Sequence, residues 1–256
     1  MSIMVPHNAA VLRFERLWWA AVDHDFTPHG VCDDETYDRL PAVPEQLFTG
    51  DFRWLSAEAA GPDAYYMQPN PVPPAALQLL NRRLSRCGVL LPASFVTFVS
   101  SSLLQGRIPS STCNGWEMSD PAPSPVEKYG FLLRFMHDQQ GCWFFYLYLA
   151  EDGSCPVLGS EELFTPEVDE DRTFTARDFM ESARWLAPNF EEFVYRYWVE
   201  NVIWHQTIYK QRPVGVLPAL AQEYASLLKV PGRPPLNSWP VPLSPWGDHP
   251  DQLTLW

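Results

Sequence analysis

Residues 129–149 read YGFLLRFMHDQQGCWFFYLYL, and this stretch decides the fold. Its two apolar, aromatic runs, Tyr129–Met136 and Cys142–Leu149, are too short for typical helices and rich in residues that favour strands. The polar connection between them ends in Gly141, which is typical of a β-hairpin loop. A third run, Cys155–Leu158, follows a second turn and carries a proline, which suits an edge strand or a strand start. We therefore expect an antiparallel meander of three strands.

Helical patterns flank this meander on both sides. In the clearest one, apolar residues recur every three or four positions from Phe190 to His205. A second pattern opens behind Pro92, which is tolerated in a first helical turn. Helices are also expected over residues 9–22, 75–87, 176–186 and 216–229, and a turn leading into a short strand is expected over residues 114–118. Together these patterns predict an α+β fold with an antiparallel β-meander packed against helices.

Proline-rich stretches divide the chain into three parts. Five prolines between residues 61 and 74 argue against a continuing helix, so we place a boundary there. The parts are a helical and loop extension (1–70), an α+β domain (71–210), and a C-terminal helix with a tail (211–256). The tail carries seven prolines and three tryptophans from residue 230 onward. Such a segment can pack on its own domain or recognise a partner.

Composition limits the classes of function. The hydrophobic content of 46% is enough for a packed core, and no apolar run is long enough to span a membrane. The N-terminus lacks the plan of a signal peptide, so we expect a cytoplasmic protein. The five cysteines form no C-x-x-C pair and are expected to be reduced. The net charge of −13 disfavours nucleic acid and anionic membranes, and either attracts a basic partner or simply maintains solubility.

The sequence contains no recognised catalytic or metal-binding motif. Residues 23–34 include Asp, His and Cys without a ligand spacing, so a polar loop is expected. Cys142 lies near His137 but lacks a nucleophile signature and is interpreted as a buried, inert strand residue. The adjacent carboxylates Glu191 and Glu192 are interpreted as solvated surface. His205 is interpreted as a core or helix-terminal histidine. We therefore predict no cofactor, no bound metal and no enzymatic activity.

Five pieces of the sequence occur in an order that resembles the SUKH superfamily, which comprises bacterial immunity proteins and fungal cell-wall regulators. They are Leu91-Pro92-Ala93-Ser94-Phe95 with Phe98, Asn114-Gly115-Trp116, the hairpin over 129–149, Pro156-Val157, and Phe190-Glu191-Glu192-Phe193. The resemblance covers about residues 75–206, and its weight lies in the order of the pieces. The chain departs from the family pattern because Ser100–Thr112 intervenes before the Asn-Gly turn and a single glycine follows Asn114.

The resemblance implies a protein-binding module that neutralises a toxin, often a nuclease or deaminase, by occluding it. Partner contacts are then expected at Trp116 and Glu117 and along an acidic tract. The tract residues are Glu167, Asp169, Glu170 and Asp171. Trp116 could equally belong to the core. The alternatives are a regulatory scaffold of the same fold with no toxin partner, and an unrecognised hydrolase or metal enzyme built on residues 24–34.

Overall fold

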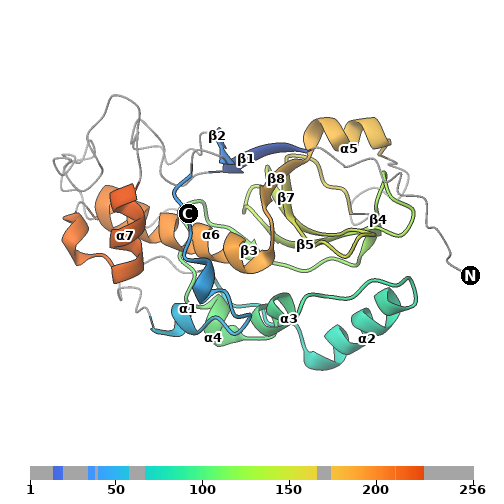
Figure 1. Ribbon diagram of the computed structural model, residues 1–256, viewed down its shortest axis with the longest axis horizontal. Helices are drawn as coiled ribbons and strands as arrows, with labels where there is room; N and C mark the ends of the chain where they lie inside the picture. The colour runs from blue at the N-terminus through green and yellow to red at the C-terminus, as the bar shows by residue number, and fades with distance from the viewer. Residues whose placement is uncertain are drawn as a thin grey trace, which may run out of the picture.

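The computed structural model describes residues 14–19, 34–37, 40–57, 67–165, 174–210 and 212–227. These residues form an α+β fold in which helices cover a curved, mixed β-sheet (Figure 1). The strands are β1 Glu15–Trp19, β2 Asp34–Thr36, β3 Gly115–Trp116, β4 Ala122–Pro123, β5 Phe131–His137, β6 Phe144–Leu149, β7 Val157–Ser160 and β8 Arg184–Ala187. Their order across the sheet is β2-β1-β8-β7-β6-β5-β3, and β4 also pairs with β5.

The predicted meander is confirmed. Strands β5 and β6 pair antiparallel from Phe131↔Leu149 to His137↔Phe144, and β7 pairs antiparallel with β6. The connecting loop is closed by the Asp138 carboxylate, whose Oδ1 accepts the backbone N–H of Cys142 at 2.6 Å and of Trp143 at 2.8 Å. Strand β7 begins immediately after Pro156, yet it lies inside the sheet because β8 pairs with its other side.

Two segments predicted as helices contain strands: one over Glu15–Trp19, and one at the end of a helix that is otherwise present. The helix expected over residues 9–22 is wrong for Glu15–Trp19, which is strand β1 and pairs in parallel with β8 at Glu15↔Arg184. The helix expected over 176–186 ends early, because α5 spans Ala176–Ser182 and Arg184–Ala187 forms β8. In both places pairing between distant segments overrides a local apolar pattern.

The remaining predicted helices are present. They are α2 Pro74–Ser85, α3 Ala93–Val99, α6 Phe190–Ile203 and α7 Ala219–Leu227. The structure also contains two short helices, α1 Arg53–Ala57 and α4 Ser102–Gln105. Helix α2 is followed by Gly88 at φ +81°, a conformation that favours glycine. Helix α6 continues into a π-helical segment, η3 Trp204–Tyr209, and the 3₁₀ turns η2 Glu45–Leu47 and η4 Val214–Val216 precede α1 and α7 respectively.

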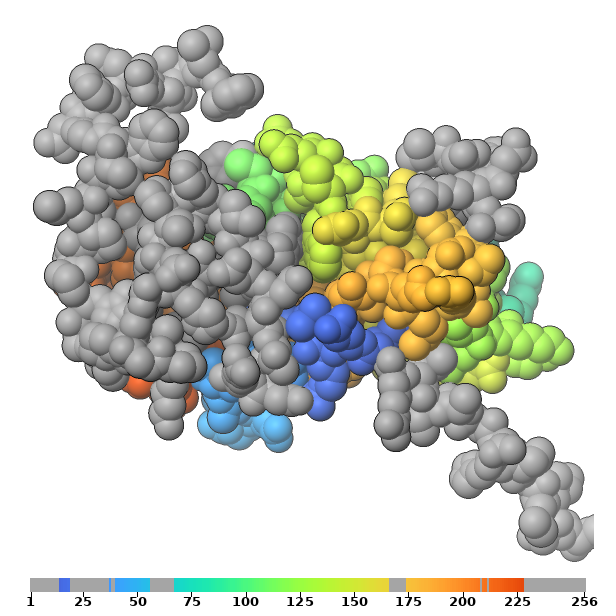
Figure 2. All heavy atoms as spheres, turned by 90° about the horizontal axis from the view of Figure 1, so that it is seen from above, coloured from blue at the N-terminus to red at the C-terminus, as the bar shows by residue number. Residues whose placement is uncertain are grey.

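The sheet buries both of its faces. Alternate residues of β6, such as Phe145 and Leu147, belong to the larger core, where Phe145 packs on Phe193 of α6. Their neighbours Tyr146 and Tyr148 point the other way into a second core, where Tyr148 packs on Phe179 of α5 and Tyr146 on Phe164. This period of two explains why every residue of β6 is buried. From above, α5 and β1 lie at the surface of the molecule (Figure 2).

The described residues of the predicted extension over 1–70 contribute to the same sheet and core as the central part. Strands β1 and β2 continue the sheet beyond β8, and Phe52, Trp54 and Leu55 belong to the larger core. The C-terminal helix α7 packs against α6. The proline-rich tail from residue 230 lies outside the described residues.

Candidate functional site

Trp116, the predicted aromatic contact, belongs to the core. It lies in β3, which pairs with the end of β5, and is 5% exposed. Its ring packs against Phe98, with centroids 5.0 Å apart, and is stacked on Phe135. The inward orientation that the sequence left open is therefore the one observed. With its ring covered, Trp116 shapes the site by packing and does not present an aromatic anchor.

Glu117, the neighbouring predicted contact, lies at the surface. Its side chain is 53% exposed, and its Oε2 lies 2.7 Å from Nε2 of His137 on the adjacent strand. Its Oε1 lies 3.7 Å from the guanidinium of Arg134. The carboxylate is thus held in place by β5 and remains accessible to a partner. Its negative charge is partly offset by Arg134.

The other predicted contacts cannot be placed. The acidic tract lies outside the described residues, and this covers Glu167, Asp169, Glu170 and Asp171. Residues 24–33 of the loop considered for a metal site also lie outside them. Within the described parts of the chain, no group of three or more His, Cys, Asp or Glu side chains could hold a metal ion.

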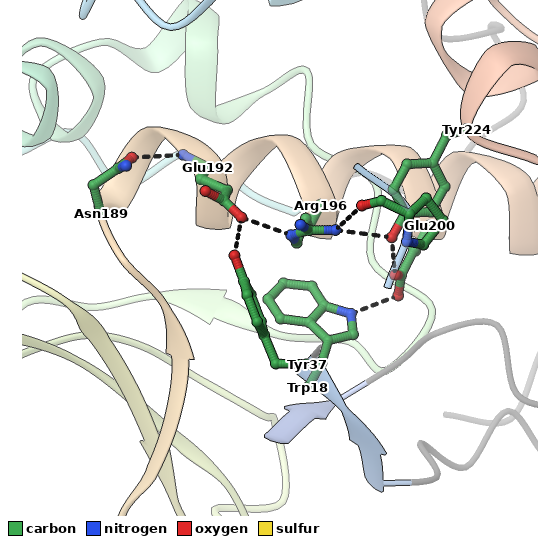
Figure 3. A network of polar contacts seen from close by, with 8 residues as sticks. Trp18, Tyr37, Asn189, Glu192, Arg196, Glu200 and Tyr224 are labelled. Atoms are coloured by element: carbon green, nitrogen blue, oxygen red, sulfur yellow. Dashed lines mark hydrogen bonds and ion pairs between the residues drawn. The ribbon is translucent and has the colours of Figure 1, made fainter. Parts of the chain in front are cut away.

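A buried network of charged and polar side chains was not predicted from the sequence. It is carried by α6, all of whose fourteen residues are buried (Figure 3). Glu191 and Glu192 are therefore not solvated surface, as predicted, but 4% and 5% exposed. They are covered by segments that precede α2 in the chain: Tyr37 bonds to Glu192, and Gly50 and Trp54 bond to Glu191.

The first half of the network centres on Glu192 and Arg196, one helical turn apart. Nε of Arg196 lies 2.9 Å from Oε1 of Glu192, and the Tyr37 hydroxyl donates to the same oxygen. Arg196 also donates to the Pro41 carbonyl at 2.9 Å, and its guanidinium lies over the Tyr37 ring. The side chain of Asn189 caps the helix by accepting the N–H of Glu192 at 2.9 Å.

The second half centres on Glu200. Its carboxylate accepts the indole N–H of Trp18 from β1 and the hydroxyl of Tyr224 from α7, both at 2.8 Å. The Tyr224 hydroxyl also lies 3.5 Å from Arg196, which joins the two halves (Figure 3). Strand β1 and helix α7 are thereby bonded to one carboxylate of the central helix.

Burial and charge set the protonation of these groups. Burial and the hydrogen bond to Glu192 raise the pKa of Tyr37 to about 12. Burial, followed by the charge of Glu200, raises the pKa of Tyr224 well above its usual value. Burial alone would lower the pKa of Arg196, but Tyr224, Tyr37 and Glu192 raise it overall, so the guanidinium stays charged. At neutral pH both tyrosines are therefore hydrogen-bond donors.

Glu191 forms a separate contact on another side of α6. Its carboxylate accepts the N–H of Gly50 at 2.7 Å and the indole N–H of Trp54 at 3.3 Å. Burial raises its pKa above the ordinary value. Gly50 has φ +82°, a conformation that favours glycine, so its amide can turn toward the helix. Glu191 thus holds the residues before α1 against the core.

These contacts give the network a structural role, which is to hold several segments of the chain against α6. Its charged groups are engaged with one another and with tyrosine, tryptophan and backbone donors or acceptors, and it joins segments from both ends of the chain to α6. The signal that could have revealed it is the spacing of Glu192, Arg196 and Glu200 at i, i+4 and i+8 in a helix that is mostly apolar and aromatic. Charges on a buried helix need partners, and here these come both from the helix itself and from Tyr37, Trp18 and Tyr224.

Two other candidate residues can also be placed. His205 is 5% exposed and lies beside Tyr209 in η3, as expected of a core histidine. Cys142 was predicted to be a buried strand residue, but it is exposed, because β6 begins two residues later and Cys142 remains in the turn.

No family model, curated protein or solved structure matched the chain in the comparisons with known proteins. Among the helices of the described residues, none combines the length and apolar character needed to cross a membrane.

Proposed function

We propose that this chain is a non-catalytic, SUKH-like protein-binding module that acts in the cytoplasm as a bacterial immunity protein. Its partner would be a toxin domain of the nuclease or deaminase type, which it neutralises by occlusion. The observation that carries the proposal is an aromatic cluster in which four of the five pieces of the family resemblance meet.

The cluster joins residues that are far apart in the sequence. Phe95 and Phe98, from the helix behind Leu91-Pro92, lie 4.9 Å and 5.5 Å from Phe190, measured between ring centroids. Phe135 of the hairpin lies 5.1 Å from Phe190 and 5.5 Å from Phe193. Trp116, after the Asn-Gly turn, packs on Phe98. The sequence pieces thus depend on one another for burial, which supports reading them as one signature.

Charge supports the choice of partner. The chain carries a net charge of −13, and Glu117 presents an accessible carboxylate at the end of β3. Proteins that act on nucleic acid tend to have basic clefts, and opposite charge speeds association and selects the partner. Because the Trp116 ring is buried, we assign recognition near β3 to charge and not to an inserted aromatic side chain.

The test begins with affinity capture of the tagged chain from its own cells at low and moderate salt, followed by mass spectrometry. The captured protein is then purified, and its association rate and enzymatic activity are measured with the chain added in increasing amounts. We expect one basic partner whose nuclease or deaminase activity is lost at a 1:1 ratio. A 1:1 partner without such activity would favour the scaffold alternative, and no partner at either salt concentration would contradict the proposal.

Charge-reversal variants locate the surface. Glu117→Lys, and separately Glu167→Lys with Asp169→Lys, are expected to slow association about tenfold at low salt, with a smaller effect at high salt. Glu45→Lys is the control for Glu117→Lys, because Glu45 is also exposed and the net charge changes equally. Equal effects of Glu117→Lys and Glu45→Lys would show that only the overall charge matters.

A further inference from the structure

A pocket lies between α7 and the segment that precedes α1. Its volume is about 240 Å³. The lining residues are Ala42, Val43, Pro44, Gln46, Tyr195, Glu223, Tyr224 and Leu227. In Figure 1 this part of the molecule lies at the opposite end from α2.

The size and lining of the pocket suit a large side chain better than a free small molecule. Sites for drug-sized ligands usually measure about 300–1,000 Å³, so this pocket is small for such a ligand. Its walls combine two tyrosines and a proline with the polar groups of Gln46 and Glu223. The two tyrosines are almost fully buried, so the accessible walls are those of Pro44 and Leu227 and of the two polar side chains. An amide or carboxylate oxygen at the rim can accept the N–H of a tryptophan, which usually has a partner when buried.

The chain itself supplies such a segment next to the pocket. Leu227 lines the pocket and is also the last described residue, so residues 228–256 continue directly from its wall. This continuation carries Trp239, Trp246 and Trp256 among its prolines. The dipeptide Pro231-Gly232 favours a turn soon after α7. An extended chain advances about 3.1 Å per residue, so residues 228–239 span up to roughly 37 Å, ample to return to the pocket.

We propose that this pocket binds the segment of residues 230–256 of the same chain, with one of its tryptophan rings inserted against Pro44 and Leu227. Insertion would remove the apolar surface of the tryptophan ring and of the exposed Leu227 side chain from water, which favours docking. Because the segment is attached at the pocket wall, its effective concentration is high, and weak intrinsic affinity is enough. This inference does not depend on the proposed function.

The test uses the full chain with the photo-crosslinking residue benzoylphenylalanine at position 46. Gln46 is exposed and lies at the pocket, so its replacement leaves the core intact. Irradiation and mass spectrometry then identify the linked peptides. The same residue at Ala42, also exposed, is a second probe. The control probe is at Leu79, which is 54% exposed on α2 at the other end of the molecule (Figure 1).

We expect links from positions 46 and 42 to peptides within residues 230–256, and at least fivefold fewer from position 79. Replacing Trp239, Trp246 and Trp256 together by alanine should reduce those links at least fivefold, while the circular dichroism spectrum stays the same. Mixing ¹⁴N- and ¹⁵N-labelled chains shows whether links form within one molecule. Absence of links to residues 230–256, equal yields from position 79, or predominantly mixed-isotope links would overturn the proposal, the last by assigning the pocket to a second copy.

Discussion

Replacing Arg196 by methionine removes the positive charge of the α6 network while keeping most of the side chain's volume. Arg196 is 4% exposed, so the Glu192 carboxylate would lose its buried counter-charge and the Pro41 carbonyl would lose a donor. Removing one partner of a buried ion pair costs about 3–5 kcal/mol, and an orphaned buried acceptor adds about 1 kcal/mol. We expect Arg196→Met to lower the free energy of unfolding by about 4–6 kcal/mol at neutral pH, measured by urea titration followed by circular dichroism.

The double variant Glu192→Gln with Arg196→Met separates lost charge pairing from lost packing. The glutamine can still accept the Tyr37 hydroxyl, but it carries no charge that needs a partner. We expect the double variant to recover at least about 2 kcal/mol relative to Arg196→Met. Arg177→Met is the control, because Arg177 pairs with Glu181 at the surface and its loss should leave the urea midpoint unchanged. A cost below about 1 kcal/mol for Arg196→Met, or no recovery in the double variant, would refute the reasoning.

Three further predictions concern single positions. Gly159→Ala should lower the free energy of unfolding by about 1–3 kcal/mol, measured by urea titration, because an added Cβ would lie 2.8 Å from the Trp143 ring. Since the pKa of Tyr37 is raised in the folded state to about 12, the folded chain keeps this proton above pH 10 while the unfolded chain loses it. Stability should therefore fall between about pH 10 and 12, and Tyr37→Phe should make that fall shallower in urea titrations across this range. At pH 8, iodoacetamide should modify exposed Cys142 before Cys155, whose pKa burial raises to about 11, as read by mass spectrometry; equal rates would contradict this.

Local sequence was sufficient where local interactions determine the structure. The hairpin of β5 and β6 was predictable because two aromatic runs flank a loop that is closed by its own residue, Asp138. Strands β1 and β8 were not predictable in this way, because they pair with each other at Glu15 and Arg184, which are distant in sequence. The apolar spacing around Leu17 and Trp18 fits a helix equally well, and pairing with β8 decides the outcome.

The candidate site was predictable to a smaller extent. Glu117 lies at the surface, as a binding residue must, whereas the burial of Trp116 depends on Phe98 and Phe135 from other elements. Glu192 looked solvated because a charged residue on a helix usually faces water. Glu192 is buried because Tyr37, from a distant part of the chain, packs against it and donates a hydrogen bond to it. The sequence pattern of α6 alone carries no information about that contact.

The contact between Trp18 and Glu200 spans 182 positions of the chain, and it has a consequence for synthesis. A ribosome adds roughly 5–20 residues per second, so β1 would leave the exit tunnel about 10–35 s before its partners on β8 and α6 exist. During that interval the apolar side chains of Leu17 and Trp18 have no native surface to cover them. The nascent chain is then a substrate for chaperones that hold extended apolar segments, and its folding rate depends on how quickly translation reaches residue 200.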